Sequence, residues 1–372
     1  MRLFILLLAL HALIHLIAVV PAKDGGLIGK SAIATGARLT TVMKVLWLLA
    51  FVLFAFTAMV YGLHMDWWWI PAIVSITLSQ VLIILWWPVA KAGTLANVLI
   101  LLVSITAFGQ WQFFKTAGNE TKAIIHNESN SNAVVTGQML RGLPLCVQKW
   151  LKQSGTIGKP LVHKVYLKQK GRMRIKPNGK WLPVHAEQYF NVDEPAFVWM
   201  VKVNMNPGMV MTGRDKFSDG NGHMLIKLYG LFKIVDEKSS KIDQGAMLRY
   251  MGEICWFPSA ALQPYFQWKE IDSCHARLTM QYKQATASAI FSFDTTGRII
   301  AVDAMRYMGG GRDARMEKWV IPARNYSSFN GISVMSEGDA IWQLKTGNYN
   351  YYRWQVTDIK YDEQIPAVAF HL

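Results

Sequence analysis

Two charged residues four positions apart are the clearest candidates for chemistry in this 372-residue sequence. Arg249 and Glu253 lie in the segment RYMGE, where helical spacing would place them on one face. A partly buried carboxylate held by an arginine can act as a general acid or base, and Asp215 is the alternative carboxylate for a hydrolase. The other interpretation is a helical salt bridge that contributes about 0.3–0.5 kcal/mol to stability. No nucleophile elbow, HExxH motif or P-loop occurs, so the sequence specifies no reaction.

Two groups of metal-ligating residue types occur, but neither has the spacing of a known metal site. The first surrounds a glycine-containing turn without the calcium-loop pattern, so a tight hairpin turn is predicted there. The second falls on a strand, where alternation would put His275 on the opposite face from its neighbours. The groups are Asp215, Asp219 and His223, and then Glu270, Asp272, Cys274 and His275. We therefore predict no metal and no cofactor.

Basic residues provide two candidate sites for anions. Gly309–Gly311, flanked by Arg306 and Arg312, is either a phosphate-binding loop or a hairpin loop. A second basic set alternates by two, so that a continuous strand would carry it as a positive ridge on one face. Its members are Lys168, Lys170, Arg172, Arg174 and Lys176. Near a membrane this ridge would attract anionic lipid headgroups by about 1 kcal/mol per residue; otherwise it is a solvated hairpin face.

Tryptophans are the candidate binding residues for an apolar ligand. A curved sheet rich in aromatic and methionine side chains can hold such a ligand in its concave face. The candidates are Trp181, Trp199, Trp256, Trp268 and Trp342. Ordinary core packing is the alternative for each of them.

Three cysteines are too few for a disulfide scaffold. Cys255 and Cys274 could pair if their domain faces an oxidising compartment. The alternative is that they are buried free thiols.

The elements that would position these residues begin near residue 161. From there, short runs of β-branched and aromatic residues are separated by turns, without the helix–strand alternation that builds a parallel sheet. Strands are predicted at about 162–169, 181–192, 196–204, 208–217, 276–283, 287–294, 298–306, 339–345 and 349–357. An apolar helix at about 244–257 should pack against the concave side of this mostly antiparallel sheet. A shorter amphipathic helix is predicted between Pro144 and Gly155.

The first part of the chain has the composition of a membrane domain. Residues 1–115 hold seven of the 39 basic and two of the 24 acidic residues. Four apolar stretches, at about 3–20, 42–63, 70–87 and 95–114, match the length of bilayer-spanning helices, with tryptophans at their boundaries. The sequence thus predicts a four-helix transmembrane domain at 1–115, a polar linker at 116–138 and a β-rich soluble domain at 139–372.

The orientation follows from basic residues in the loops. The first loop carries Lys23, Lys30, Arg38 and Lys44, which places it in the cytoplasm by the positive-inside rule. Four spans then put the C-terminal domain outside the cytoplasm of a bacterial plasma membrane. Nucleic acid is not expected as a partner there, because no binding motif accompanies the positive charge.

His11 and His15 share one face of the first span. They either bind a metal or haem, or they bond to neighbouring helices.

The landmarks of the chain resemble a family of bacterial membrane-anchored proteins that is conserved but functionally uncharacterised. The matching segments are LPLCVQKWL (143–151), GRDKFSDGNG (213–222), LRYMGEICWFPSAAL (248–262), HARLTM (275–280), FSFDTTGRI (291–299) and WQLKTGNYNYYRW (342–354). By overall pattern the soluble domain is also similar to lipoprotein-carrier folds, in which an unclosed antiparallel half-barrel wraps helices and holds acyl chains.

Three functions fit these observations. The leading hypothesis is a membrane-anchored domain that binds a lipid or another apolar ligand. The second is an envelope hydrolase that uses Glu253 or Asp215. The third is an assembly protein whose spans dock a membrane protein partner.

Overall fold

The computed structural model describes residues 2–17, 19, 41–125, 133–206 and 208–366. The chain divides into two compact units, Met1–Gln112 and Phe113–Leu372, which are described separately below. Of the basic residues that predict the orientation, Lys23, Lys30 and Arg38 lie outside the described residues, and Lys44 lies in the helix at Thr41–Gly62.

The N-terminal unit is helical. Its elements are α1 (Arg2–Ile17), α3 (Thr41–Gly62), α4 (Trp69–Leu85), α5 (Trp87–Ala90) and the first part of α6 (Gly93–Ile125). Among the described residues, α3 and α6 are the two helices long and apolar enough to cross a membrane, and α1 and α4 are shorter apolar helices. Leu3, Val42, Ile84 and Leu95 are each more than half exposed, so these helices carry apolar side chains outward as well as inward.

A buried polar network links three helices of this unit. The Nε2 atom of His11 is 2.9 Å from Oδ1 of Asn97, and Nε2 of His15 is 2.8 Å from Oγ of Ser79. Asn97 also donates hydrogen bonds to Ser79 and to Gln80. The two histidines therefore bond to neighbouring helices, which is the second of the two interpretations of their spacing.

The C-terminal unit begins within α6, which continues to Ile125. Residues 116–125 of the predicted polar linker are therefore helical. Ala117 and Ile124 are buried at helical spacing against Tyr189 and Val198 of the sheet, and this packing stabilises the helix. Residues 126–132 of the predicted linker lie outside the described residues.

A large antiparallel sheet fills most of the C-terminal unit. Its first group of strands is β1 (Lys164–Met173), β2 (Leu182–Asn191), β3 (Ala196–Asn206), β4 (Met209–Ser218), β5 (Asn221–Leu228) and β6 (Phe232–Glu237). The second is β7 (Phe266–Glu270), β8 (His275–Tyr282), β9 (Ala285–Phe293), β10 (Ile299–Met308), β11 (Arg315–Phe329), β12 (Ile332–Leu344) and β13 (Gly347–Tyr361). In the described part of the unit these thirteen strands form one sheet in the order β6-β5-β4-β3-β2-β1-β13-β12-β11-β10-β9-β8-β7.

This strand order consists of two meanders joined where β1 pairs with β13. The helical connection between the meanders runs from β6, at one edge of the sheet, to β7, at the other. It contains α8 (Ser240–Glu253), followed by two 3-10 turns, Ile254–Trp256 and Pro258–Leu262. A single connection thus links the two edges of the sheet.

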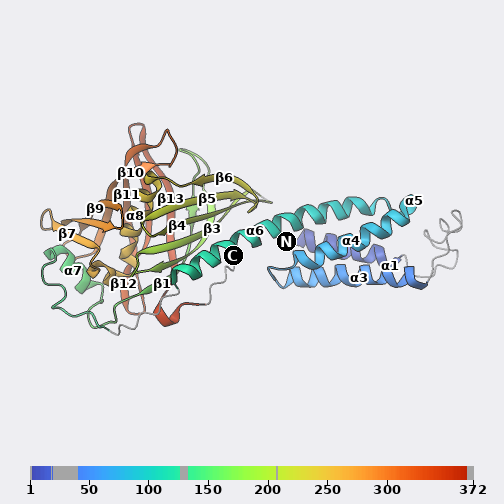
Figure 1. Ribbon diagram of the computed structural model, residues 1–372, viewed down its shortest axis with the longest axis horizontal. Coiled ribbons are helices and arrows are strands. Elements are labelled where there is room, and N and C mark those ends of the chain that lie inside the picture. Colours follow the sequence, from blue (N-terminus) through green and yellow to red (C-terminus); the bar gives the residue numbers. More distant parts are fainter. Residues whose placement is uncertain (1, 18, 20–40, 126–132, 207, 367–372) are drawn as a thin grey trace. The chain divides into compact units, whose positions relative to one another are not determined.

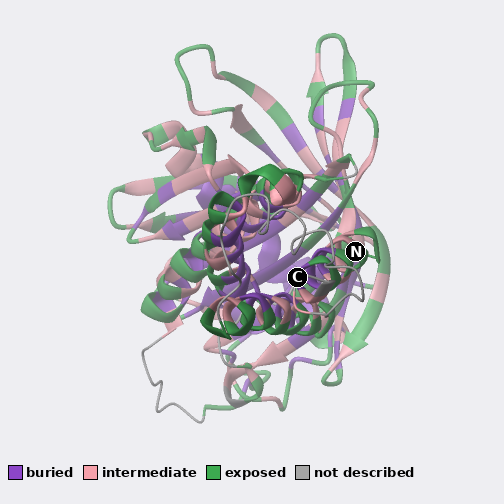
Figure 2. Cartoon of the chain, turned by 90° about the vertical axis from the view of Figure 1, so that its right-hand side faces the viewer, coloured by how far each residue is buried: buried purple, intermediate pink, exposed green. Residues whose placement is uncertain are grey.

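The sheet curls around α8. This helix contacts β4 and β5 on one side of the seam and β8, β9 and β10 on the other, which a flat sheet could not allow. Figure 1 shows α8 among these strands, and Figure 2 shows exposed residues at the hairpin tips. One continuous core joins α8, the inner face of the sheet and α7 (Leu145–Gln153).

The predicted antiparallel sheet and its central helix are confirmed, and each predicted strand overlaps an observed one. The predicted helix at 244–257 begins earlier, at Ser240, because Oγ of Ser239 accepts a hydrogen bond from the amide of Ile242 and caps it. Four strands were missed: β5, β6, β7 and β11.

Candidate functional site

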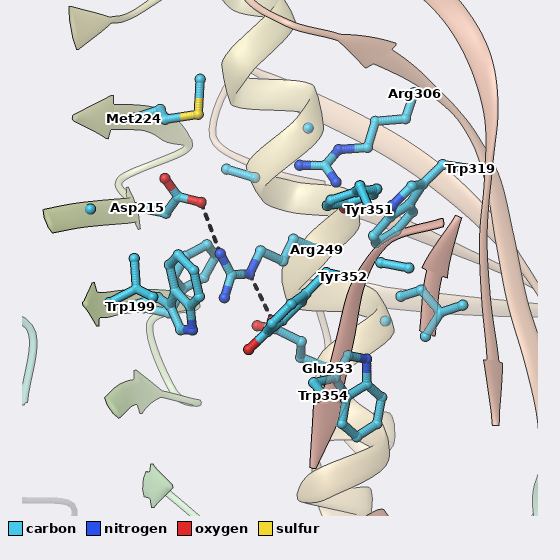
Figure 3. Close-up of a pocket in the computed structure, with 18 of the residues that line it drawn as sticks. Trp199, Asp215, Met224, Arg249, Glu253, Arg306, Trp319, Tyr351, Tyr352 and Trp354 are labelled. Atoms are coloured by element: carbon cyan, nitrogen blue, oxygen red, sulfur yellow. Dashed lines mark hydrogen bonds and ion pairs between the residues drawn. The ribbon is translucent and has the colours of Figure 1, made fainter. Parts of the chain in front are cut away.

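A cavity lies between α8 and the inner face of the sheet. It encloses about 310 Å³, which is within the size range of small-molecule sites in proteins. Its walls come from strands of both meanders and from the whole length of α8 (Figure 3). The curling of the sheet around the helix therefore creates the site.

Aromatic and aliphatic side chains form most of the cavity wall. Three of the tryptophans proposed from the sequence line it: Trp199, Trp256 and Trp342. The structure adds Trp319 and Trp354, which the sequence analysis missed. Trp354 lies two positions after Tyr352 on β13, and both line the cavity, so alternation along this predicted strand is the signal that could have found it. Trp319 lies opposite Trp342 through the pairing of β11 with β12, which no local pattern encodes.

The other two proposed tryptophans lie elsewhere. Trp181 precedes β2 and stacks with two cations, Arg174 at 4.0 Å and Arg353 at 4.6 Å from its ring centroid. Trp268 packs against Trp150 and Phe291 in the core. Neither lines the cavity.

The charged pair proposed from the sequence sits in the cavity wall. Nε of Arg249 donates to Oε1 of Glu253 at 2.7 Å, and Nη1 donates to Oδ2 of Asp215 at 2.9 Å (Figure 3). Nη2 donates to the side-chain oxygen of Gln188 at 3.2 Å, and Gln188 in turn donates to Glu253 at 2.7 Å. The guanidinium also lies 4.5 Å from the centroid of the Trp199 ring. All three nitrogens of Arg249 are therefore occupied by groups of the protein itself.

Burial changes the acid–base properties of this network. It raises the pKa of the Glu253 carboxyl above its ordinary value, and the Arg249 guanidinium opposes this rise without cancelling it. Burial disfavours the charged form of Arg249, but the carboxylates of Glu253 and Asp215 outweigh that effect and raise its pKa. In the same wall, burial raises the pKa of the Cys255 thiol well above its ordinary value, so this thiol stays protonated and unreactive at neutral pH.

Of the other groups proposed from the sequence, the fold pairs His223 with a residue outside its group but brings Asp272 and His275 together. The expectation that His275 faces away from its neighbours on a strand is therefore wrong, because residues 271–274 form a loop between β7 and β8. Asp219 lies in the turn between β4 and β5 with a φ of 53°, while His223 pairs with Asp236 at 2.8 Å. Asp272 pairs with His275 at 2.8 Å on an exposed loop. All three cysteines are free thiols; Cys146 and Cys255 are buried and Cys274 is partly exposed.

The basic ridge is partly continuous. Lys168, Lys170 and Arg172 are exposed at alternating positions on the outer face of β1, and Lys168 lies 3.6 Å from Glu187. Arg174 turns aside to stack on Trp181, and Lys176 is exposed in the following turn. The fold thus gathers three of these cations on one face, and their contact with lipid stays a prediction.

An open antiparallel sheet wrapped around a helix, with an apolar cavity between them, defines a class of half-barrel domain. The chain belongs to a family of unknown function, DUF6544, whose family description matches residues 133–354. This match confirms the resemblance to an uncharacterised family and covers α8 and the sheet as far as Trp354 in β13. No significant match is found among curated proteins.

Two solved structures match part of the chain at low similarity. A DUF1329 family protein from Desulfovibrio piger is 9% identical with a TM-score of 0.35, and the match covers 59% of this chain and 93% of that one. A LolA superfamily protein from Nitrosomonas europaea is 10% identical with a TM-score of 0.34, covering 59% and 94%. Similarity at this level does not define a ligand.

Proposed function

We propose that this protein is a membrane-anchored binding protein whose C-terminal unit holds a lipid or another apolar molecule in the cavity beside α8. The carrying observation is the cavity itself, which is walled mainly by aromatic and aliphatic side chains. Such a surface favours an apolar ligand, because binding removes the apolar surface of both the cavity and the ligand from water.

The N-terminal unit supplies the anchor in this proposal. We infer that its four apolar helices span a bacterial plasma membrane and that the C-terminal unit works outside the cytoplasm. The exposed apolar side chains on α1, α3, α4 and α6 support a lipid environment. Lys168, Lys170 and Arg172 would then contact anionic headgroups, and the spans would offer a surface for a membrane protein partner.

The arrangement of Arg249 favours binding over hydrolysis. An acid–base catalyst needs a carboxylate that is free to exchange a proton with a substrate. Both candidate carboxylates, Glu253 and Asp215, already bond to the Arg249 guanidinium, and Glu253 also accepts from Gln188. This closed network holds α8 against β2 and β4 and shapes the cavity wall.

A cavity-filling substitution tests the proposal. Met224 lines the cavity, so Met224→Trp should occupy part of its volume, whereas Met305→Trp adds the same side chain on the exposed face of β10. Full-length protein is extracted from native membranes into amphipol, and bound lipids are counted by native mass spectrometry. Lipids around the helices are common to both variants, so the difference between the variants reports the cavity.

We expect wild-type protein and Met305→Trp to retain one or more lipids that Met224→Trp loses, with similar melting temperatures for all three. Equal lipid content in the three proteins would contradict cavity binding.

A further inference from the structure

A second arginine reaches the cavity and differs from Arg249 in its surroundings. Arg306 lies on β10, and its side chain extends inward toward α8 (Figure 3). Its guanidinium carbon is 4.6 Å from the centroid of the Trp319 ring and 5.7 Å from that of Trp342. The two rings hold the guanidinium in place by cation–π contact.

Gly245 of α8 leaves room for the Arg306 guanidinium. A Cβ atom at Gly245 would lie 3.1 Å from Nε and 3.5 Å from an Nη atom of Arg306. A glycine inside a helix destabilises it by about 1 kcal/mol relative to alanine. The close approach of Arg306 therefore explains why a glycine stands at position 245, since a larger residue would press against the guanidinium.

Arg306 makes no hydrogen bond or ion pair with any residue in the described part of the chain. Its Nε is buried without a partner. Glu317 lies opposite on β11, but no ion pair forms between them. Arg306 is partly buried, and of its five N–H donors the buried one on Nε has no partner, which is unfavourable unless an anion completes the site. Arg249, in the same cavity, is already neutralised by two carboxylates.

The two ends of the cavity differ in chemistry. Gly245, near the start of α8, contacts Arg306, and Lys241 one turn earlier also lines the cavity. The Lys241 ammonium donates to the Gly311 carbonyl at 3.0 Å. At the other end the wall is apolar, with Trp256 and Trp354 packed edge to face at 5.3 Å. About 18 Å of α8 and the following 3-10 turn separates Gly245 from Trp256.

From this gradient we propose that the ligand is an anionic amphiphile, an aliphatic chain whose carboxylate or phosphate head pairs with Arg306 and whose tail runs toward Trp256. This inference rests on the proposed function. The head receives charge-assisted hydrogen bonds from the unused guanidinium donors, and Lys241 adds positive charge nearby. The neutralised Arg249 network lies beside the tail and does not compete for the head.

The test compares two photoreactive probes on full-length protein in amphipol: a diazirine-bearing C16 fatty acid and its methyl ester. Crosslinks are mapped to cavity peptides as a function of probe concentration. The variants are Arg306→Gln, Arg306→Lys and the matched control Arg312→Gln, which changes an exposed cation on the neighbouring loop. Inorganic phosphate serves as a competitor that lacks a chain, and melting temperatures are recorded for each variant.

We expect wild-type protein and Arg312→Gln to bind the acid at least about tenfold more tightly than the ester, because a hydrogen bond to a charged group contributes that much. Arg306→Gln should bind both probes with the affinity of the ester, and Arg306→Lys should fall between. The melting temperature of lipid-free Arg306→Gln should be unchanged or higher, since a buried N–H donor without a partner is removed.

Equal binding of acid and ester by wild-type protein would overturn the inference and leave the proposed function intact. The same holds if Arg306→Gln keeps the preference, or if it loses both probes and melts earlier, which would make Arg306 structural. Displacement of the acid by millimolar phosphate alone would identify a free anion instead of an amphiphile. Absence of cavity crosslinks with either probe would remove the proposed function itself.

Discussion

Glu253 is a buried acid with two opposing influences on its charge. Burial favours the protonated form, while Arg249 and Gln188 favour the carboxylate, and the balance leaves its pKa raised. From the ordinary value of 4.5 up to the folded pKa, the native protein therefore holds a proton that the unfolded chain has lost. Across that range, the contribution of Glu253 to stability falls as the pH rises.

We therefore expect the melting temperature of wild-type protein to fall relative to that of Glu253→Gln as the pH is raised from 4.5. Thermal unfolding followed by tryptophan fluorescence measures this difference. Glu270→Gln, which changes an exposed glutamate on β7, should show no such trend. A difference that grows in favour of wild-type protein with rising pH would contradict a raised pKa.

Residue spacing predicted part of this site. Arg249 and Glu253 meet because they are four apart on one helix, which is a local rule. Asp215 and Gln188 join them only because β4 and β2 pass beside α8, and no local pattern encodes that. The sequence predicted Arg306 only as a flank of a glycine loop. Its position in the cavity depends on Gly245 and Trp319, which lie elsewhere in the chain.

At the scale of elements, α6 shows how packing overrides local composition. Its last turns are rich in Asn, Glu and Lys, which predicted a linker. Arg214 of β4 is 4% exposed and lies 2.8 Å from Glu120 on α6, and Asn191 donates to the Ile124 carbonyl at 2.7 Å. These contacts fix the end of the helix to the outer face of the sheet.

Removing the Glu120 carboxylate should destabilise the C-terminal unit by about 2–3 kcal/mol, because it leaves Arg214 buried with an uncompensated charge. The test is a double-mutant cycle of Glu120→Gln and Arg214→Met, measured by thermal unfolding, with Lys122→Gln as an exposed control on the same helix. The double variant should be more stable than the sum of the single effects predicts. Additive effects would mean that the pair is not coupled.

The missed strand β11 has a physical explanation. Pro322 and Asn325 interrupt its sequence pattern, and both residue types are uncommon within strands. In the fold, the pairing of β11 with β12 shifts register around Asn325. The strand tolerates these residues because neighbours on both sides hold it, which single-sequence patterns cannot show.

At the scale of the whole molecule, the sequence predicted the antiparallel sheet and central helix but not the order in which the strands pair. Alternation identifies strands and turns, whereas the pairing of β1 with β13 joins segments almost two hundred positions apart. The predicted side of the membrane depends on residues outside the described part of the chain, so a direct test is needed.

Cysteine accessibility provides this test. Cys274 is the partly exposed thiol, and Cys146 and Cys255 are buried. If the C-terminal unit lies outside the cytoplasm, a membrane-impermeant maleimide should label Cys274 in intact spheroplasts, and Cys274→Ser should abolish labelling. Labelling that appears only after lysis would place the unit in the cytoplasm.

The outer strands of the sheet, β6 and β7, end the hydrogen-bonded order without pairing to each other in the described residues. In a closed barrel, strand number and shear fix the bore. In this open sheet, changes in strand twist can widen or narrow the space between its two edges while the hydrogen bonds between paired strands are kept. If the cavity holds an apolar ligand as proposed, molecules of different width would fit without loss of hydrogen bonds between strands.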